Sequence, residues 1–593
     1  MKPLININRK YLVIIALTYV SCSYTDSEQE YLDLAKTYAK HNNQNKALEY
    51  YQKALTENPT NFEACFNSAS IFYSQDNPTN AIIFYKKAIA LNPNSPAAWF
   101  NVGMSYNQDG NTDQAMVAFK KTIELNPSHS KAHQHLASIY EKQKNIPLAL
   151  VHNKISLTFD PNNVETLRKT ANLLKQSDNF EEAIPLFQRA LASDPKNIHT
   201  MLDLANTYNM IDDLDAALTW YQQILEINPA INEARYNYAF TLKKQGHFIQ
   251  AMEIYKELIA IKPTYAQPHF SLSLAYLSLG DFEHGWQEYE WRWAAYNETP
   301  KKFNAPLWQG EDIQGKTILL YSEQGLGDTF QFIRYAKLIS EQGGTVIFQA
   351  QKPLKTILSL CPYIHRVVIA GDSIPHIDYQ IPLMSLPLIF KTTVDTVPAA
   401  LPYLYANDTL ITDWHKKLAH DTNFKIGICW QGNANYSTQF LRRTVAAKSI
   451  HVKEFAALGD IPGISLYSLQ KMNGSEQLQE IRSLINIKEF DGNFDQDHGR
   501  FMDTAAVIKN LDLVITVDTS ISHFAAALGC PTWILLPEPP DWRWMIDRKD
   551  TPWYPNVRLF KQPTLGDWQS VFAAVGVALE QLLTERKSMS THS

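Results

Sequence analysis

Small, apolar and polar positions recur with one fixed period between residues 27 and 297. Prolines stand 34 residues apart, and an alanine stands twelve residues before each of them. The prolines are Pro59, Pro93, Pro127, Pro161, Pro195, Pro229 and Pro263. Within each unit the apolar residues lie three or four positions apart, as on one face of a helix. The pattern predicts pairs of helices joined by turns, in which small residues admit the rings of the facing helix.

This array resembles the tetratricopeptide repeat in its period and at nearly every characteristic position. The resemblance implies a superhelix that binds a protein or peptide in its groove. An eighth unit lacks a proline at position 297 and is expected to cap the array. The expected repeat domain is therefore 27–297, with about eight units.

The position 26 residues before each periodic proline is occupied by a polar residue in every repeat that has such a proline. A ladder of polar side chains along a groove could hydrogen-bond the backbone of a partner. The alternative is an ordinary solvated face. The candidate partner-binding residues are Asn67, Asn101, His135, Asp203 and Asn237.

The pattern changes after residue 297. A joint punctuated by proline and glycine, 298–315, precedes short apolar runs that alternate with helical stretches, as in a parallel sheet wrapped by helices. Expected strands are 317–321, 345–350, 366–369 and 378–383, and then 425–430, 465–469, 513–517 and 532–536. Two Rossmann-like halves follow, 316–405 and 424–585, with a connection at 406–423 and a tail at 586–593. A cleft is expected between them.

The stretch after the first expected strand carries candidate chemistry. Gly325, Gly327, Asp328 and Thr329 stand where a strand turns into a helix, and unpaired N–H groups at a helix N-terminus attract anions. Asp328 has a simpler interpretation as a helix cap. The stretch lacks the third glycine of a dinucleotide fingerprint and the lysine of a Walker loop.

Polar residues also follow the strands of the second half. In open α/β sheets, ligands bind at the carboxyl ends of the strands. The candidates there are Gln431, Lys448, Gln470, Lys471, Glu476, Asp518, Thr519, Ser520 and His523. His523 could instead be a buried structural histidine.

Together these motifs, over about 306–582, resemble glycosyltransferase family 9, the group that contains heptosyltransferases, and its tetratricopeptide-fused relatives. The resemblance implies a GT-B fold and metal-independent sugar transfer from a nucleotide-sugar donor, with no other cofactor. It makes Asp328 the general base and Lys448 the cation beside the phosphates. Glu476 is expected near the ribose, and 518–523 at the phosphates. General-base chemistry beside preorganised N–H donors suits such a transfer.

Two alternatives stay open. A superhelix before a GT-B domain also resembles the architecture of protein O-glycosyltransferases of the O-GlcNAc transferase type. The other alternative is a scaffold that binds peptides through its repeats and whose transferase domain is inactive.

Composition excludes several classes of function. The net charge of -6 and the absence of long basic runs argue against nucleic-acid binding. Five scattered cysteines suggest neither a disulfide scaffold nor a zinc site. The pair Asp495 and Asp497 could imitate a metal-binding motif, but a solvated loop is the preferred interpretation.

The first 26 residues place basic residues before the apolar run YLVIIALTYV. This order is typical of a secretory signal or a membrane tether, with a misassigned start or an ordinary apolar leader as the alternative. Because nucleotide sugars are normally made in the cytoplasm, we expect the active domain on the cytoplasmic side, either free or associated with the membrane through 1–26. Export through the N-terminal segment is the other possibility.

Overall fold

The computed structural model describes residues 27–433, 435 and 439–590. The signal-like segment 1–26 lies outside the described residues. The chain divides into two compact units, and the division falls between residues 227 and 228. Among the described residues, no helix combines the length and apolar character needed to cross a membrane.

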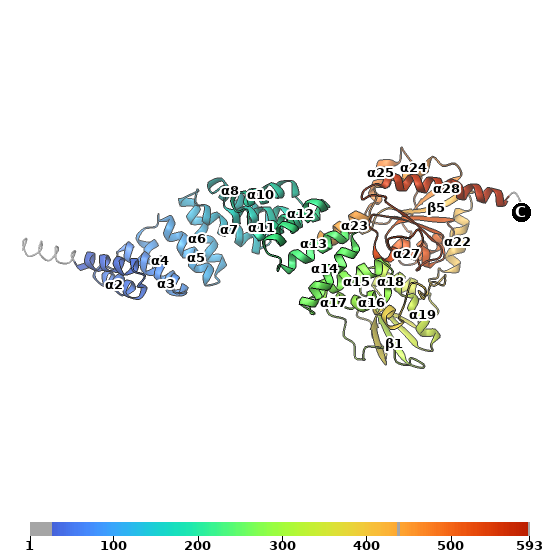
Figure 1. Ribbon diagram of the computed structural model, residues 1–593, viewed down its shortest axis with the longest axis horizontal. Helices are drawn as coiled ribbons and strands as arrows, with labels where there is room; N and C mark the ends of the chain where they lie inside the picture. Colours follow the sequence, from blue (N-terminus) through green and yellow to red (C-terminus); the bar gives the residue numbers. More distant parts are fainter. Residues whose placement is uncertain (1–26, 434, 436–438, 591–593) are drawn as a thin grey trace, which may run out of the picture. The chain divides into compact units, whose positions relative to one another are not determined.

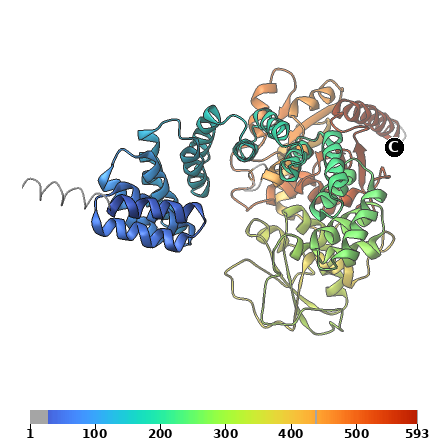
Figure 2. The ribbon, with the colours of Figure 1, turned by 60° about the vertical axis from the view of Figure 1, so that its left-hand side comes forward.

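The first unit consists of antiparallel helix pairs (Figures 1 and 2). A helix at 27–40 comes first. The others are α2 (Gln44–Glu57), α3 (Phe62–Ser74), α4 (Pro78–Leu91), α5 (Pro96–Gln108), α6 (Thr112–Leu125), α7 (Ser130–Lys142), α8 (Ile146–Phe159), α9 (Val164–Gln176), α10 (Phe180–Ser193), α11 (Ile198–Met210) and α12 (Leu214–Ile227). This confirms the predicted tetratricopeptide solenoid.

Local chemistry sets the helix ends. Asn61, for example, accepts a hydrogen bond from the backbone N–H of Ala64, which satisfies one otherwise unpaired donor of α3. Helix α2 ends at Glu57, its C-cap is Asn58, and the periodic proline Pro59 follows. Proline at this place cannot continue the helix.

The small periodic residues allow close helix packing, as predicted. A Cβ atom placed on Gly103 would lie 2.8 Å from the ring of Phe119 on the neighbouring helix. Phe119 and the periodic Ala115 are both fully buried. A larger residue at position 103 would therefore displace the ring.

The second unit begins with the last repeats. Its helices are α13 (Asn232–Lys244), α14 (Phe248–Ile261), α15 (Ala266–Ser278), α16 (Phe282–Tyr289) and the single turn α17 (Arg292–Ala295). The expectation that the eighth repeat is only a terminal cap is incomplete. Buried Trp286 donates its indole N–H to the carbonyl of Thr392, 3.1 Å away, in the α/β part. Buried Arg292 forms an ion pair with Glu323 at 2.7 Å. Because these contacts attach the repeat to the α/β part, the division of the chain precedes the predicted boundary at 297.

The first half of the α/β part is a four-stranded parallel sheet of order β3-β2-β1-β4. The strands are β1 (Thr317–Tyr321), β2 (Thr345–Gln349), β3 (Arg366–Val368) and β4 (Tyr379–Pro382). The helices are α18 (Leu326–Phe332), α19 (Arg334–Glu341), α20 (Lys355–Leu358) and α21 (Leu386–Ile389). Each strand begins and ends within two residues of its predicted limits.

The second half is a six-stranded parallel sheet of order β10-β9-β8-β5-β6-β7. Its strands are β5 (Phe424–Cys429), β6 (Ile464–Ser468), β7 (Ile487–Lys488), β8 (Leu513–Val517), β9 (Thr532–Leu536) and β10 (Val557–Lys561). Its helices are α22 (Asp408–Leu418), α23 (Gln439–Lys448), α24 (Ala456–Gly459), α25 (Leu478–Ile481), α26 (Met502–Ile508), α27 (Ser520–Ala527) and α28 (Trp568–Ser590), the last of which lies beside α24 in Figure 1.

Three elements of this half were not predicted from the sequence. Strands β7 and β10 extend the sheet at its two edges. The expected connection 406–423 contains helix α22, whose buried Trp414 donates a hydrogen bond to Asp503 at 2.8 Å. The connection is therefore packed against the second half.

Candidate functional site

A cavity of about 450 Å³ lies where the two halves of the α/β part meet. From the first half, Gly325 and the first two residues of α18 line it, together with Pro353. The residues that follow β5, β6 and β8 line it from the second half. This position, at the carboxyl ends of parallel strands, is the one that ligands use in open α/β sheets. Its volume falls within the range of small-molecule sites, roughly 300 to 1,000 Å³.

Glycine allows the close approach of the halves at Gly327. A Cβ atom there would lie 3.0 Å from the ring of His523 and 3.5 Å from the Cα atom of Ser520. The start of α18 therefore packs against the start of α27.

The structure brings only part of the predicted set to the cavity. The predicted residues that line it are Gly325, Gly327, Gln431, Gln470, Lys471, Asp518, Thr519 and Ser520. The predicted residues outside the lining are Asp328, Thr329, Lys448, Glu476 and His523. Both groups include residues that the resemblance assigns to donor binding.

Lys448 forms ion pairs with two carboxylates. Its Nζ atom lies 2.6 Å from Oδ2 of Asp518 and 3.2 Å from Oδ2 of Asp541. Although burial opposes its charge, these two acids raise the pKa of Lys448 above its usual value. Lys448 therefore neutralises acids of the chain itself, including the predicted phosphate-turn residue Asp518.

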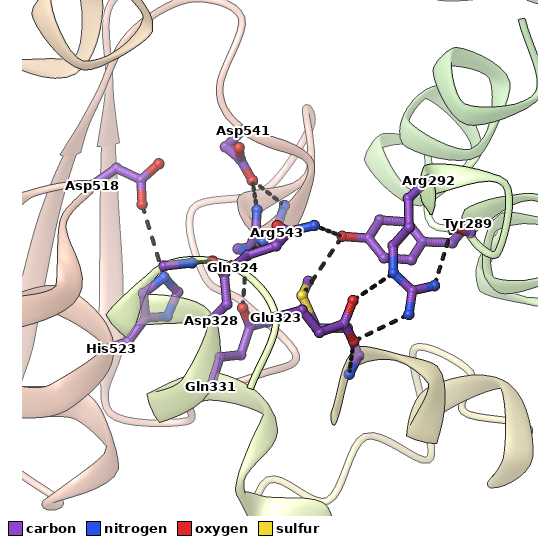
Figure 3. A network of polar contacts seen from close by, with 12 residues as sticks. Tyr289, Arg292, Glu323, Gln324, Asp328, Gln331, Asp518, His523, Asp541 and Arg543 are labelled. Carbon is purple, nitrogen blue, oxygen red and sulfur yellow. Dashed lines mark hydrogen bonds and ion pairs between the residues drawn. The ribbon is translucent and has the colours of Figure 1, made fainter. Parts of the chain in front are cut away.

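Asp328 is held by the second half of the α/β part. Its Oδ1 atom accepts from the guanidinium of Arg543, and its Oδ2 atom accepts from the N–H of Gly325 at 2.8 Å. Arg543 also pairs with Asp541 at 2.8 Å and donates to Gln331 at 3.0 Å (Figure 3). The simpler interpretation of Asp328 as the N-cap residue is therefore wrong in its position: Gly325 is the N-cap of α18, and Asp328, at the third helical position, accepts from the N–H of that cap. Asp328 is also half of an ion pair between the halves. A role as base stays a prediction.

The network reaches the repeats. In Figure 3, Tyr289 and Arg292 of the last repeat lie across from Asp518 and His523, with Arg543 between them. The hydroxyl of Tyr289 accepts from Gln324 at 3.3 Å. Burial raises the pKa of Tyr289, so it stays protonated. The last repeat therefore contacts the loop that carries the glycine-rich turn.

His523 is a buried structural histidine in this arrangement. Its Nδ1 atom lies 2.9 Å from the hydroxyl of Tyr554, and its ring stacks on Trp544 with centroids 5.1 Å apart. Burial lowers the pKa of His523 to about 3, although Asp518 opposes the shift. His523 is therefore neutral at physiological pH and contributes no positive charge to a phosphate site.

This neutral histidine predicts an acid-sensitive fold. In the unfolded chain a histidine becomes protonated below about pH 6.5, whereas His523 in the folded protein becomes protonated only near pH 3. The free energy of unfolding should therefore decrease as the pH is lowered from 6.5 towards 3. The contribution of His523 to this decrease approaches about 1.4 kcal/mol per pH unit. We expect His523→Gln to be less stable at pH 7 and to depend less steeply on pH. Denaturant titrations followed by tryptophan fluorescence at pH 7, 6 and 5 measure this slope.

The matched control is His420→Gln, because His420 is exposed. It should keep the slope of the unchanged protein. All of the 13 tryptophans except Trp99 and Trp220 lie in the second unit, so fluorescence reports mainly on that unit. Equal slopes for the His523 variant and the unchanged protein would contradict the prediction.

Three other predicted donor residues serve the fold. Gln470 accepts from the backbone N–H groups of Trp430 and Gln431 at 3.1 and 3.0 Å, and so ties β6 to the end of β5. Thr329 is buried and donates to Gln351 at 3.0 Å. Exposed Glu476 accepts from the N–H of Gly474 at 3.0 Å. The structure assigns Thr329 and Glu476 no contact with the cavity.

The polar ladder of the repeats is half-buried. His135 stacks on the ring of Phe119, with centroids 5.1 Å apart. Asp203 accepts from Arg168 and Asn172 at 3.1 and 2.8 Å. A solvated face is therefore the wrong interpretation for His135 and Asp203, because both side chains already have partners in the array.

No group of three or more His, Cys, Asp or Glu side chains in 27–433, 435 and 439–590 is placed to hold an ion. The solvated-loop interpretation suits exposed Asp497 and is wrong for Asp495, which accepts from the backbone N–H of Thr504 at 3.0 Å. Asp495 thus holds the start of α26.

Asp541, Arg543 and Arg500 are not among the site residues predicted from the sequence. Asp541 and Arg543 belong to the segment DWRW, in which opposite charges stand among tryptophans. Charged residues in such an apolar setting are usually paired when buried, so the sequence of this segment already indicated a buried ion pair. Arg500 lines the cavity, and no pattern in its neighbourhood distinguished it.

Comparisons with known proteins concern mainly the repeats. Models of the tetratricopeptide repeat match residues 32–96, 96–129, 174–239 and 233–265. Protein FlbA of Caulobacter vibrioides is 23% identical over 334 residues, which cover 52% of this chain and 54% of FlbA. The chain thus spans about half the length of this curated relative.

Several solved tetratricopeptide proteins are similar to part of the chain. YrrB, described as a TPR protein with an unusual peptide-binding site, is 21% identical, covers 31% of this chain and 95% of its own, and has a TM-score of 0.29. The C-terminal part of a TPR protein from Cytophaga hutchinsonii is 15% identical, with a TM-score of 0.37. The match covers 41% of this chain and 99% of that protein's chain. A TPR protein from Parabacteroides merdae is 18% identical, with a TM-score of 0.31. The match covers 42% of this chain and 99% of that protein's chain. The family models show that this chain contains tetratricopeptide repeats, which support a role in protein–protein interaction.

Proposed function

We propose that the chain is a glycosyltransferase of the GT-B type, similar to glycosyltransferase family 9. It moves a sugar from a nucleotide-sugar donor to an acceptor hydroxyl, and its repeats bind a protein partner or the protein acceptor. The cavity between the two parallel-sheet halves carries this proposal. We place the activity in the cytoplasm, where nucleotide sugars are made, with residues 1–26 as the candidate tether.

The chemistry of the cavity suits a diphosphate. Thr519 and Ser520 line it at the N-terminus of α27, where unpaired N–H groups attract anions. Gly325 and Gly327 let the backbone of the first half approach the same space. A leaving nucleoside diphosphate would be stabilised by such preorganised donors.

The alternative is a scaffold whose α/β part does no chemistry. One observation favours it. Both Asp328, the candidate base, and Lys448, the candidate phosphate cation, are engaged in ion pairs within the chain. If those pairs only join the halves, the repeats alone would carry the function.

A panel of nucleotide sugars separates these proposals. We expect one donor to raise the melting temperature, because a ligand at 100 times its Kd stabilises by about 2.7 kcal/mol. The same donor should be slowly hydrolysed or transferred, and EDTA should leave this turnover unchanged. Release of the nucleoside diphosphate measures the reaction. Neither stabilisation nor turnover with any donor would favour the scaffold, and turnover that needs added manganese or magnesium would contradict metal independence.

A further inference from the structure

Two cations line the cavity, and the paired Lys448 is not one of them. Lys471 and Arg500 both line it. Lys471 donates to the carbonyl of Phe494 at 3.0 Å, and Arg500 contacts Sδ of Met472, a further lining residue, at 3.4 Å. Within the part of the chain that the structure describes, neither cation forms an ion pair with a carboxylate.

The two positive charges lie close enough to interact. Burial lowers the pKa of Lys471, nearby acids oppose this shift, and the positive charge of Arg500 adds to it. The acid with the largest influence, Asp495, already accepts two hydrogen bonds from Thr504. The other lining carboxylate, Asp518, is paired with Lys448. Two adjacent cations without a paired acid are suited to an anion that bridges them.

The turn that carries Arg500 has an unusual backbone. Gly499 and Phe501 on either side of it have φ values of +98° and +69°. A bulky residue with positive φ is rare, costs on the order of 1 to 3 kcal/mol, and tends to occur at functional sites. The Phe501 ring packs on Phe330 of the first half and Phe524 of the second, both with centroids 5.3 Å away. Packing therefore maintains this backbone, which holds Arg500 at the cavity.

We propose that Arg500 and Lys471 bind the diphosphate of a nucleoside diphosphate, in place of the expected Lys448. Arginine suits this role because its planar guanidinium can make two parallel hydrogen bonds to phosphate oxygens. Thr519 and Ser520 at the start of α27 line the same cavity and would supply N–H donors to the same group. This assignment rests on the proposed function and names the groups that hold the donor.

Calorimetric titration of the full chain with ADP, GDP, UDP and CDP tests the assignment. We expect at least one to bind, and Arg500→Gln and Lys471→Gln each to weaken it roughly 10-fold or more, because each removes a charge-assisted contact. The matching nucleoside should bind equally to all variants. The control is Arg482→Gln, because Arg482 is exposed in the same half and outside the cavity lining. Inorganic pyrophosphate, if it binds, should lose affinity in the same two variants.

The outcomes separate this inference from the proposed function. If the unchanged protein binds a nucleoside diphosphate and both variants bind it equally well, the assignment is wrong and the proposed function stands. If no nucleoside diphosphate binds the unchanged protein, the proposed function fails and the assignment with it. Thermal melting without ligand checks the folding of each variant, and because Arg500 is exposed, its variant should melt normally.

Discussion

Replacement of Arg543 by methionine is expected to lower the free energy of unfolding of the second unit by about 3 to 5 kcal/mol, the usual cost of removing one partner of a buried ion pair. Arg543 is buried and pairs with two acids, Asp328 and Asp541, that lie on different halves of the α/β part. Methionine fills a similar volume and leaves both acids with fewer partners. The expected loss is large because desolvated carboxylates without a counterion are costly.

Arg548→Met is the matched control. Arg548 lies five residues further along, and its partner Asp550 is exposed. Exposed pairs contribute about 0 to 1 kcal/mol, so this variant should unfold almost like the unchanged protein. Denaturant titration followed by tryptophan fluorescence compares the two. An Arg543 variant no less stable than the Arg548 variant would show that the buried network contributes little to stability.

Asp328→Asn is expected to reduce turnover roughly 100-fold or more, if Asp328 is the base of the proposed transfer. The amide oxygen of asparagine can still accept from the N–H of Gly325, so the start of α18 is preserved. Asparagine cannot take the proton of an acceptor hydroxyl. The Asp328 side chain keeps 18% of its surface exposed, so its carboxyl group is not fully enclosed by its contacts with Gly325 and Arg543.

The measurement is turnover per folded molecule together with donor affinity. Donor affinity should change little, because Asp328 does not line the cavity. Asp408→Asn is the control, since Asp408 is an exposed acid in the first turn of α22 and should leave turnover unchanged. If Asp328→Asn melts at much lower temperature with turnover per folded molecule intact, Asp328 only caps the helix and pairs with Arg543. The base must then be sought elsewhere in the cavity or on the repeats.

Much of the α/β fold could be predicted because its strands are local apolar runs. Strands β1, β8 and β9 match their predicted limits. Strand β7 has two residues, and β10 contains the charged residues Arg558 and Lys561 among its five positions, so neither has the continuous apolar run used to find the others. Both lie at sheet edges, where one side lacks a neighbouring strand.

The candidate site was less predictable. The sequence located the glycine-rich turn and 518–523 correctly at the ends of strands, because strand ends can be read locally. The sequence could not show that Lys448 forms ion pairs with Asp518 and Asp541, which lie 70 and 93 residues away along the chain. Charge pairing at such separations depends on how the strands are ordered in the sheet.

The sequence by itself determined the repeats, since a 34-residue period places small and large residues opposite each other in neighbouring helices. It also determined the two parallel sheets, through apolar runs that only a doubly covered sheet can bury. Only the tertiary structure decided which charges are neutralised within the chain and which remain at the cavity. Ion pairs such as Arg543 with Asp328 join residues from separate halves, 215 positions apart. Their energy depends on distance and burial, and neither exists until the halves pack together.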